Sequence, residues 1–132
     1  YVHQDLHEMN LYPCAYSMTF NVTGNKLNAI LNQRSQDILA ANNWNVVQYA
    51  VLVHMLAQCC DMYVGEFMHV IADAHIYDRH IPLVEELIKR PVFDAPKFFM
   101  NPDIKDFYKF TKDDVWVEGY QYGEQISIPV AI

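Results

Sequence analysis

The sequence has 132 residues, enough for one domain with a buried core. With 52% hydrophobic and 19% charged residues it has the composition of a folded globular protein, which excludes a disordered chain. The formal net charge of −7 argues against nonspecific binding of nucleic acid, because such binding needs a basic face. We therefore expect a single domain over residues 1–132 and no nucleic-acid partner.

The cysteines indicate the cellular compartment of the protein; there are three, Cys14, Cys59 and Cys60. Their number is odd, and two adjacent cysteines form a disulfide only with strain, so we expect reduced thiols in a cytoplasmic protein. The longest apolar run, residues 46–60, is too short and too often interrupted by polar residues to span a membrane. The sequence begins with Tyr1 rather than methionine and its start has no clear pattern, so we expect the back part of a longer chain.

Strand-like and helix-like patterns alternate along the chain, which predicts a single α/β unit. The expected elements in chain order are an irregular start (1–10), a hairpin (16–22 and 26–35, with its turn at 23–25), a helix (45–60), a strand (66–71) leading to 73–77, an amphipathic helix (80–89), a short strand, turn and short helix (92–114), a last strand (115–120) and an apolar tail (121–132). The first helix has apolar residues on so many sides that we expect most of its surface to be buried. Asn42 and Asn43 are fit to cap its start, and Gly65 is expected at a break after it.

Cys14 is the first candidate for chemistry, and Arg34 is its expected neighbour. Pairing of the two hairpin strands would bring Arg34 and Ser35 beside Cys14, which follows a proline and is restrained on its N-terminal side. A thiol attacks as thiolate, which a nearby cation stabilises. The pattern predicts a nucleophilic cysteine that acts on an anionic substrate; a buried cysteine and a surface arginine are the alternative.

Asp73, His75 and Tyr77 alternate, so on a strand they would project from one face. Burying a carboxylate, an imidazole and a phenol requires a partner for each. The pattern indicates either a polar wall for a hydroxylated ligand or a buried hydrogen-bonded cluster. No pair of histidines or cysteines has the spacing of a zinc site, and the four glycines are not clustered into a phosphate loop, so we expect no metal site.

Five motifs together resemble the thymidylate synthase family. In chain order they are Pro13-Cys14, Gln33-Arg34-Ser35 with Asp37, Asn45 at the opening of a long helix, Asp73-x-His75-x-Tyr77, and Pro129-Val130-Ala131-Ile132. Residues 101–108 and 119–120 are similar to the C-terminal segment of the family. The motifs occur in the family's order, close to its spacing and over essentially the whole chain.

The resemblance implies an enzyme that converts dUMP to dTMP, with 5,10-methylenetetrahydrofolate as donor of both the carbon and the hydride. It implies an α/β (α+β) fold in which helices flank a mixed, twisted β-sheet and one sheet face forms a homodimer. The ligands would be dUMP and folate, and neither a metal nor a membrane would take part.

The resemblance also implies roles for single residues. Cys14 would add to C6 of the uracil, Arg34 would bind the phosphate near the thiolate, and Asn45 would read the uracil edge and act in catalysis. The substrate side would further include Gln33, Asp37, Ser35 as a second phosphate ligand, and the pair His75 and Tyr77 at the 3′-hydroxyl.

The folate side would include Asp37 at the pterin ring, Ala41 and Tyr120. It would also include Ala131 and the terminal Ile132, which belong to a tail that closes over the complex.

Some positions depart from the family pattern. Ala15 stands where many members have histidine, and Gln36 stands where a cysteine is common. Ala41 and Ala72 occupy positions that are often glycine, so their methyl groups could crowd the folate. Pyrimidine hydroxymethylases that act on cytosine nucleotides tend to carry an acid at the place of Asn45, so uracil is favoured.

Family members also have an N-terminal half, with a phosphate-binding loop, a catalytic glutamate and an arginine pair donated across the dimer. None of these features is found in the present sequence. We therefore expect the N-terminal half of the same protein as a partner. A non-catalytic fragment that keeps nucleotide binding or dimerisation, and a related pyrimidine-nucleotide hydroxymethylase, are the alternatives.

Overall fold

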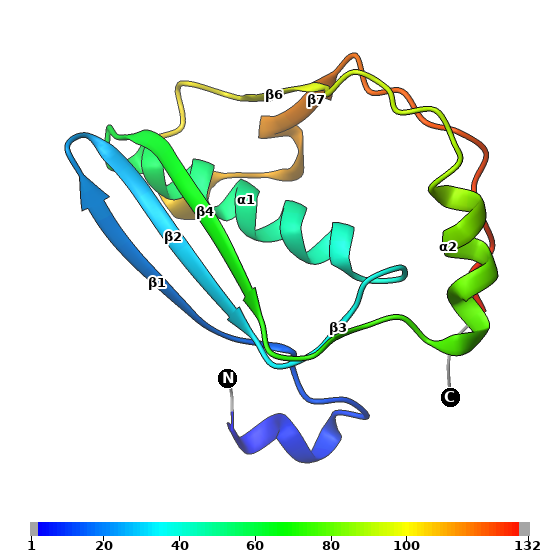
Figure 1. Cartoon of the computed structure of the whole chain (residues 1–132). Helices are drawn as coiled ribbons and strands as arrows, with labels where there is room; N and C mark the ends of the chain where they lie inside the picture. Colours follow the sequence, from blue (N-terminus) through cyan, green and yellow to red (C-terminus); the bar gives the residue numbers. More distant parts are fainter. Residues whose placement is uncertain (1–2, 130–132) are drawn as a thin grey trace.

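The computed structural model describes residues 3–129, which form the mixed α+β arrangement expected from the sequence (Figure 1). The strands are β1 (Ala15–Thr23), β2 (Lys26–Gln33), β3 (Gln36–Asp37), β4 (Tyr63–Ile71), β5 (Ala74–His75), β6 (Lys97–Met100) and β7 (Val115–Glu118). The helices are α1 (Asn42–Cys59) and α2 (Ile81–Leu87), with short 3-10 turns η1 (His3–Glu8), η2 (Asp78–His80), η3 (Phe107–Lys109) and η4 (Lys112–Asp114). Within residues 3–129, no helix is long and apolar enough to cross a membrane.

The central sheet has the strand order β1-β2-β4. β1 and β2 form an antiparallel hairpin in which Thr23 pairs with Lys26, so the hairpin predicted from the turn residues is confirmed. Gly24 in the turn has φ 62°, a left-handed conformation that glycine adopts without strain. β4 pairs with β2 in parallel, and α1 is the crossover that connects them.

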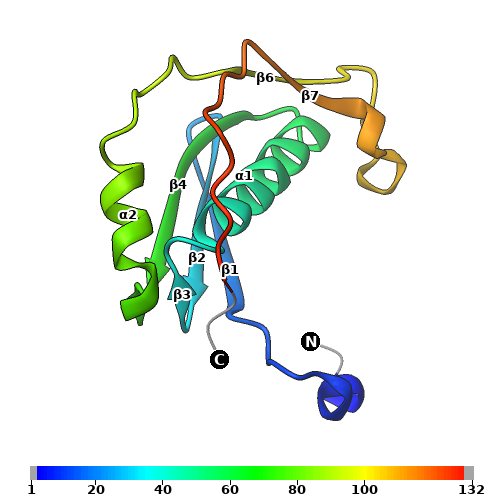
Figure 2. The same ribbon diagram turned by 90° about the vertical axis from the view of Figure 1, so that its right-hand side faces the viewer.

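The core lies between β2 and one side of α1 (Figures 1 and 2). Leu27 and Ala29 of β2 pack with Val53 and Ala57 of the helix, and none of the four is more than 8% exposed. The expectation that most of the helix surface is buried is wrong. Trp44 in its first turn is 78% exposed, because the sheet covers only one side of the helix.

Two element boundaries also differ from expectation. α1 begins at Asn42, with Ala41 as the N-cap residue and no side-chain hydrogen bond at the cap, so Asn42 lies inside the helix. Gly65 lies inside β4 rather than at a break. A side chain at Gly65 would collide with Asn28, whose Oδ1 occupies that space and accepts a hydrogen bond from the Glu66 N–H at 2.9 Å. The start of the chain, expected to be irregular, contains η1.

The ends of β2 and β4 continue into a second parallel pair, β3 and β5. The Gln36 N–H donates to the Asp73 carbonyl at 2.8 Å, and the Ile38 N–H donates to the His75 carbonyl at 3.0 Å, so the two strand ends stay together. β6 and β7 form a separate antiparallel pair. After Gly119 the described chain has no regular structure and runs past α2, where Arg90 contacts Glu124 and His80 contacts Pro129 (Figure 1).

Candidate active site

A cavity of about 190 Å³ lies where β2 ends and β3 begins. Its walls come from the segment before β1, the β2–β3 connection, the start of α1 and the segment around β5. The lining residues are Leu11, Cys14, Gln33, Arg34, Ser35, Gln36, Asp37, Ala41, Asn45, His75 and Tyr77. Tyr120 is not among them, and Ala131 and Ile132 lie outside the described residues. Apart from these three and Asp73, which lies beside the lining residues Ser35 and His75, the cavity brings together every site residue expected from the sequence.

Arg34 fixes the segment that carries Cys14. Its Nη2 donates to the carbonyl of Tyr12 at 2.8 Å and its Nε donates to the carbonyl of Pro13 at 3.3 Å. Its backbone N–H donates to the carbonyl of Cys14 at 2.9 Å. Three successive carbonyls are therefore held by one residue of the facing strand end. The thiol of Cys14 is half-buried and free, so the arginine both positions the cysteine and brings a positive charge to the same cavity.

A hydrogen-bond network centred on Gln33, which is 2% exposed, underlies the cavity. Its Nε2 donates to the backbone carbonyl of Ser35 at 2.8 Å and to Asn45 Oδ1 at 3.2 Å, and it also contacts Gln36 Oε1. Since a backbone carbonyl only accepts, the nitrogen of Gln33 must face Ser35 and its oxygen must face away. That oxygen lies 3.0 Å from His69 Nε2, which is therefore the donor.

The network determines how Asn45 presents itself to the cavity. Its Oδ1 faces the nitrogen of Gln33, so its Nδ2 remains available as a donor. Burial lowers the pKa of His69, which favours the neutral ring that donates to Gln33. The sequence does not predict that His69 and Gln36 contact Gln33, which orients Asn45, because no sequence period links these residues.

Asp73, His75 and Tyr77 do not share one face of a strand, contrary to the alternation argument. β5 contains only Ala74 and His75, and Tyr77 is the N-cap residue of η2. The three side chains nevertheless meet. His75 Nδ1 lies 3.3 Å from Asp73 Oδ2, although the two atoms lack the alignment of a hydrogen bond, and the rings of His75 and Tyr77 contact edge-on at 5.0 Å.

The hydroxyl of Ser35 joins this cluster by donating to Asp73 Oδ2 at 3.3 Å. Asp37 lies on the other side, at the start of the turn that leads into α1. Its Oδ1 accepts from the N–H groups of Leu39 and Ala40 at 3.1 and 3.0 Å, and its Oδ2 is left for other partners. A carboxylate held through one oxygen can recognise an N–H group of a ligand with the other.

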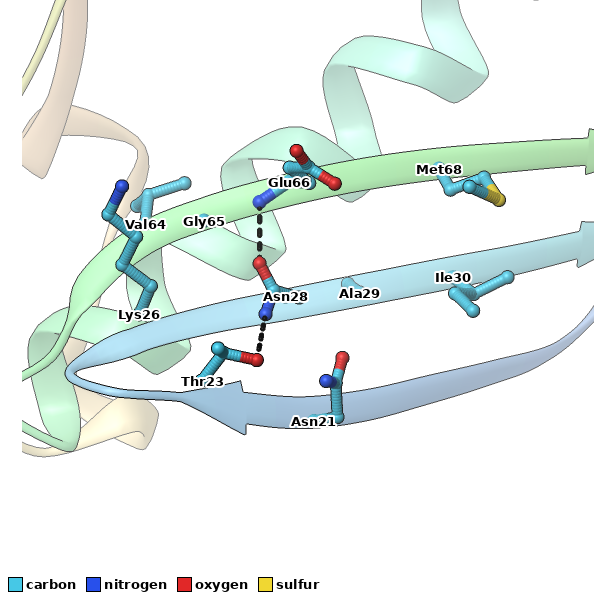
Figure 3. A pocket seen from close by; sticks show the side chains of 10 residues that line it. All are labelled: Asn21, Thr23, Lys26, Asn28, Ala29, Ile30, Val64, Gly65, Glu66 and Met68. Atoms are coloured by element: carbon cyan, nitrogen blue, oxygen red, sulfur yellow. Dashed lines mark hydrogen bonds between the residues drawn. The ribbon is translucent and has the colours of Figure 1, made fainter.

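A larger hollow of about 560 Å³ opens on the outer face of the central sheet, away from α1 (Figure 3). Asn28 and Ile30 project there because they alternate with the core residues of β2. Asn28 bridges the three strands, since its Nδ2 donates to Thr23 Oγ1 at 3.3 Å and its Oδ1 accepts from the Glu66 N–H. The thiol, guanidinium and imidazole groups gather in the smaller cavity, so we place the candidate active site there.

Comparison with known proteins identifies the family. Residues 1–132 match the family described as thymidylate synthase. The thymidylate synthases of Bacillus mojavensis and Bacillus licheniformis are 40% and 41% identical to this chain over 128 residues. These alignments cover 97% of this chain but 46% of each relative, so the chain spans about half the length of the curated relatives it matches.

A solved structure agrees with the sequence relatives. The thermostable thymidylate synthase A from Bacillus subtilis matches with a TM-score of 0.90 and 38% sequence identity. That match covers 96% of this chain and 46% of the solved chain. The five motifs, the family match over the full sequence and the shared fold lead to one conclusion: the chain belongs to the thymidylate synthase family.

Proposed function

We propose that the protein containing this chain converts dUMP to dTMP, with 5,10-methylenetetrahydrofolate as co-substrate. The observation that carries the proposal is the meeting of Cys14, Arg34, Asn45, His75 and Tyr77 around one cavity of about 190 Å³. A thiol, a cation, an amide and two polar rings are the groups needed to attack a pyrimidine, bind its phosphate, read its edge and hold its sugar. Membership of the thymidylate synthase family supports the same reaction.

Cys14 is the proposed nucleophile. Its thiolate sulfur bonds to C6 of the uracil ring, and the electron pair of the C5–C6 double bond moves toward C5 and O4. C5 thereby becomes able to form a bond to carbon. The folate co-substrate, when bound, would supply the methylene carbon and the hydride and leave as dihydrofolate, and C5 would give up its proton to a base. At the end the sulfur–C6 bond breaks, the thiolate leaves and the C5–C6 double bond is restored. Arg34, in the same cavity, favours the thiolate at both stages.

Arg34 and Ser35 are the proposed phosphate ligands. An arginine has five N–H donors, and Arg34 uses two of them on the carbonyls of Tyr12 and Pro13, which leaves three for a phosphate. The Ser35 hydroxyl donates to Asp73 in the free chain. We expect it to turn its proton toward the phosphate when the nucleotide binds, which leaves Asp73 to interact with the His75 ring.

Asn45 is the proposed reader of the base. With Oδ1 toward Gln33, its Nδ2 can donate to O4 of uracil, and this bond strengthens as negative charge develops on that oxygen. The exocyclic amine at the same position of cytosine would meet a second donor. This orientation favours a uracil nucleotide over the cytosine nucleotides of the hydroxymethylase alternative. His75 and Tyr77 complete the nucleotide side by binding the 3′-hydroxyl of the deoxyribose.

Asp37 begins the proposed folate side. Its Oδ1 is occupied by backbone N–H groups, so Oδ2 is the atom expected to accept from the pterin ring. Closure of the tail over the bound ligands would exclude water from the reactive one-carbon unit. The remaining residues proposed for this side are Ala41, Tyr120, Ala131 and Ile132.

We also propose that the outer sheet face pairs with a second copy of the protein, forming a homodimer. Ile30, Met68 and Val70 project from that face and are 36%, 56% and 44% exposed, an apolar area that association would remove from water. The hollow in Figure 3 lies on the same face and would receive side chains of the second copy. The further proposed partner is the N-terminal half of the same protein, against which α1 could bury Trp44.

We also propose that the protein acts in the cytoplasm and that residues 1–132 form the C-terminal part of one catalytic domain.

Covalent trapping tests the function. 5-Fluoro-dUMP with methylenetetrahydrofolate should add the mass of both ligands to the complete protein, and peptide mapping should locate the adduct at Cys14. Cys14→Ser should give no adduct, whereas Cys60→Ser, which alters an exposed thiol, should react normally. Wild-type protein without an adduct, and without dihydrofolate formation from dUMP, would support the non-catalytic alternative. Turnover of dCMP in preference to dUMP would support the hydroxymethylase.

A further inference from the structure

His80 is a buried titratable side chain that the proposed reaction does not use. It is 1% exposed and ends η2, directly before α2. Its ring contacts Tyr77 edge-on, with 5.7 Å between ring centroids, and its Nδ1 lies 3.9 Å from Asp37 Oδ2. The ring therefore lies where the proposed nucleotide side of the cavity, at Tyr77, meets the proposed folate side, at Asp37.

The other ring nitrogen of His80 holds the C-terminal tail, which we define as residues 119–129. Nε2 lies 2.8 Å from the carbonyl oxygen of Pro129. Because a carbonyl only accepts, the proton of this hydrogen bond belongs to Nε2. Nδ1 is buried and has no hydrogen-bond partner in the described part of the chain. The contact with Pro129 is thus the bond that orients the ring.

A second side chain holds the tail at an earlier point. Arg90, just beyond α2, donates from Nη1 to the carbonyl of Glu124 and pairs through Nη2 with Glu86 Oε1 at 2.6 Å. The tail has no strand or helix of its own to fix its course (Figure 2). The course of the tail is therefore fixed by His80 before α2 and Arg90 after α2, which both donate to backbone carbonyls of the tail.

We infer that His80 is a positioning residue that fixes the C-terminal tail at the folate side of the active site. The inference rests on the proposed function, because the tail matters for catalysis only if it closes over the folate. His80 contacts both Pro129 and Asp37. A bond at Pro129 therefore limits how far this part of the tail can move from Asp37, and its loss enlarges the set of tail conformations that folate binding must restrict.

Two variants separate the hydrogen bond from the packing. His80→Gln keeps an N–H donor on a side chain of similar reach, and His80→Leu fills the space without a donor. Both lose the ring contact with Tyr77, so the difference between them reports on the bond to Pro129. In the complete protein, His80→Leu should raise KM for methylenetetrahydrofolate by roughly three- to tenfold, the loss expected for one neutral hydrogen bond. KM for dUMP should stay within twofold (about 0.4 kcal/mol), and His80→Gln should recover most of the effect.

A second measurement does not depend on turnover. Backbone amide hydrogen exchange in residues 124–129 of the tail, followed by mass spectrometry of peptic peptides, should be several-fold faster in His80→Leu than in His80→Gln or the wild type. His54→Leu, at a half-buried histidine that packs on Phe98 of β6 instead of the tail, is the control and should exchange at the wild-type rate. Equal behaviour of the Gln and Leu variants in both measurements, or a parallel rise of both KM values, would overturn the inference. An inactive wild type would refute the proposed function alone, since the exchange rates would still test the role of His80.

Discussion

The side-chain nitrogen of Gln33 donates to Oδ1 of Asn45 over 3.2 Å. The orientation of this pair is not free, because the same nitrogen faces the carbonyl of Ser35 at 2.8 Å and the oxygen of Gln33 faces His69. A backbone carbonyl therefore determines, through one buried glutamine, which end of the asparagine amide is offered to a bound pyrimidine. The chemistry of the cavity thus depends on Gln33, a buried side chain at the centre of this network.

Gln33→Leu should weaken nucleotide binding and lower stability. The substitution leaves the carbonyl of Ser35 and Oδ1 of Asn45 without a donor, which should cost about 1–3 kcal/mol of unfolding free energy. Asn45 can then turn, so KM for dUMP should rise by about tenfold, the equivalent of one lost hydrogen bond. Steady-state kinetics and chemical denaturation measure the two effects.

Gln58→Leu is the matched control for Gln33→Leu. Gln58 is a half-buried glutamine whose Nε2 donates to the backbone carbonyls of Asn101 and Ile104, and it lies far from the cavity at the other end of α1. It should lose a similar amount of stability with KM for dUMP unchanged. A rise of KM for dUMP in both variants would mean that Gln33→Leu acts through a general loss of stability and not through the orientation of Asn45.

Arg34→Lys should slow attack by Cys14 more than it weakens phosphate binding. A lysine keeps the charge, but its ammonium lacks the planar fork that reaches the carbonyls of Tyr12 and Pro13 while leaving donors for a phosphate. The rate of adduct formation with 5-fluoro-dUMP should fall at least about tenfold, with a smaller change in nucleotide affinity. Lys105→Met removes the exposed pair with Asp61 and a 3.5 Å contact with the Gln58 carbonyl, both outside the cavity, and should leave both values unchanged.

Acidification should destabilise the protein through His69. Burial lowers its pKa in the folded chain below the ordinary value of 6.5, so the unfolded chain binds a proton at higher pH than the folded chain. The stability is therefore fully present above about pH 6.5 and declines as the pH falls from there through the folded pKa. His54, whose pKa burial also lowers, adds to the same slope.

His69→Gln isolates this contribution, because a glutamine can still donate to Gln33 without titrating. Urea denaturation between pH 8 and pH 5 should give a shallower loss of unfolding free energy for this variant than for the wild type, at similar stability near about pH 8. His7→Gln, at a histidine whose side chain is 76% exposed, serves as the control. An unchanged slope in His69→Gln would place the acid sensitivity elsewhere.

Local patterns predicted the parts of the site that lie on neighbouring strands. The turn at Gly24 fixes the hairpin register from the Thr23–Lys26 pair to the Ser17–Asn32 pair. An irregularity between Ala15 and Ser17 then shifts the pairing by one position, so that Ala15 pairs with Gln33 and Cys14 lies beside Arg34. The order of motifs was likewise enough to assign the family that the comparisons establish. The first inference uses residues that are close in sequence, and the second uses the spacing of motifs within a known family.

Contacts between distant segments could not be predicted in this way. His69 and Gln33 are 36 positions apart, and His80 and Pro129 are 49 apart, with no period connecting either pair. Composition also showed how much of α1 is apolar without showing what covers it, which is why the exposure of Trp44 was not expected. The place of Gly65 inside β4 is not evident from local sequence for a related reason: the side chain that needs the space beside it, Asn28, belongs to another strand.

Gly65→Ala should destabilise the central sheet by displacing Asn28. The new methyl group would occupy the place of Asn28 Oδ1, so the Glu66 N–H would lose its acceptor and the bond from Asn28 to Thr23 would break (Figure 3). A lost hydrogen bond with an unsatisfied donor should cost about 1–3 kcal/mol of unfolding free energy. Because these residues line the outer sheet face, the proposed homodimer should also dissociate at higher protein concentration, as measured by sedimentation.

A double-mutant cycle tests this explanation directly. Asn28→Ala removes the group that the new methyl meets, so Asn28→Ala with Gly65→Ala should cost less than the sum of the two single changes, with a coupling of about 1 kcal/mol or more. Some cost should remain, since the Leu27 carbonyl stands 3.0 Å from the ideal Cβ position. Gly123→Ala, whose Cβ would meet only Arg90 Nη1 at 3.6 Å, should stay within about 0.5 kcal/mol of the wild type. Additive costs would show that Gly65 is required by the backbone of β4 and not by Asn28.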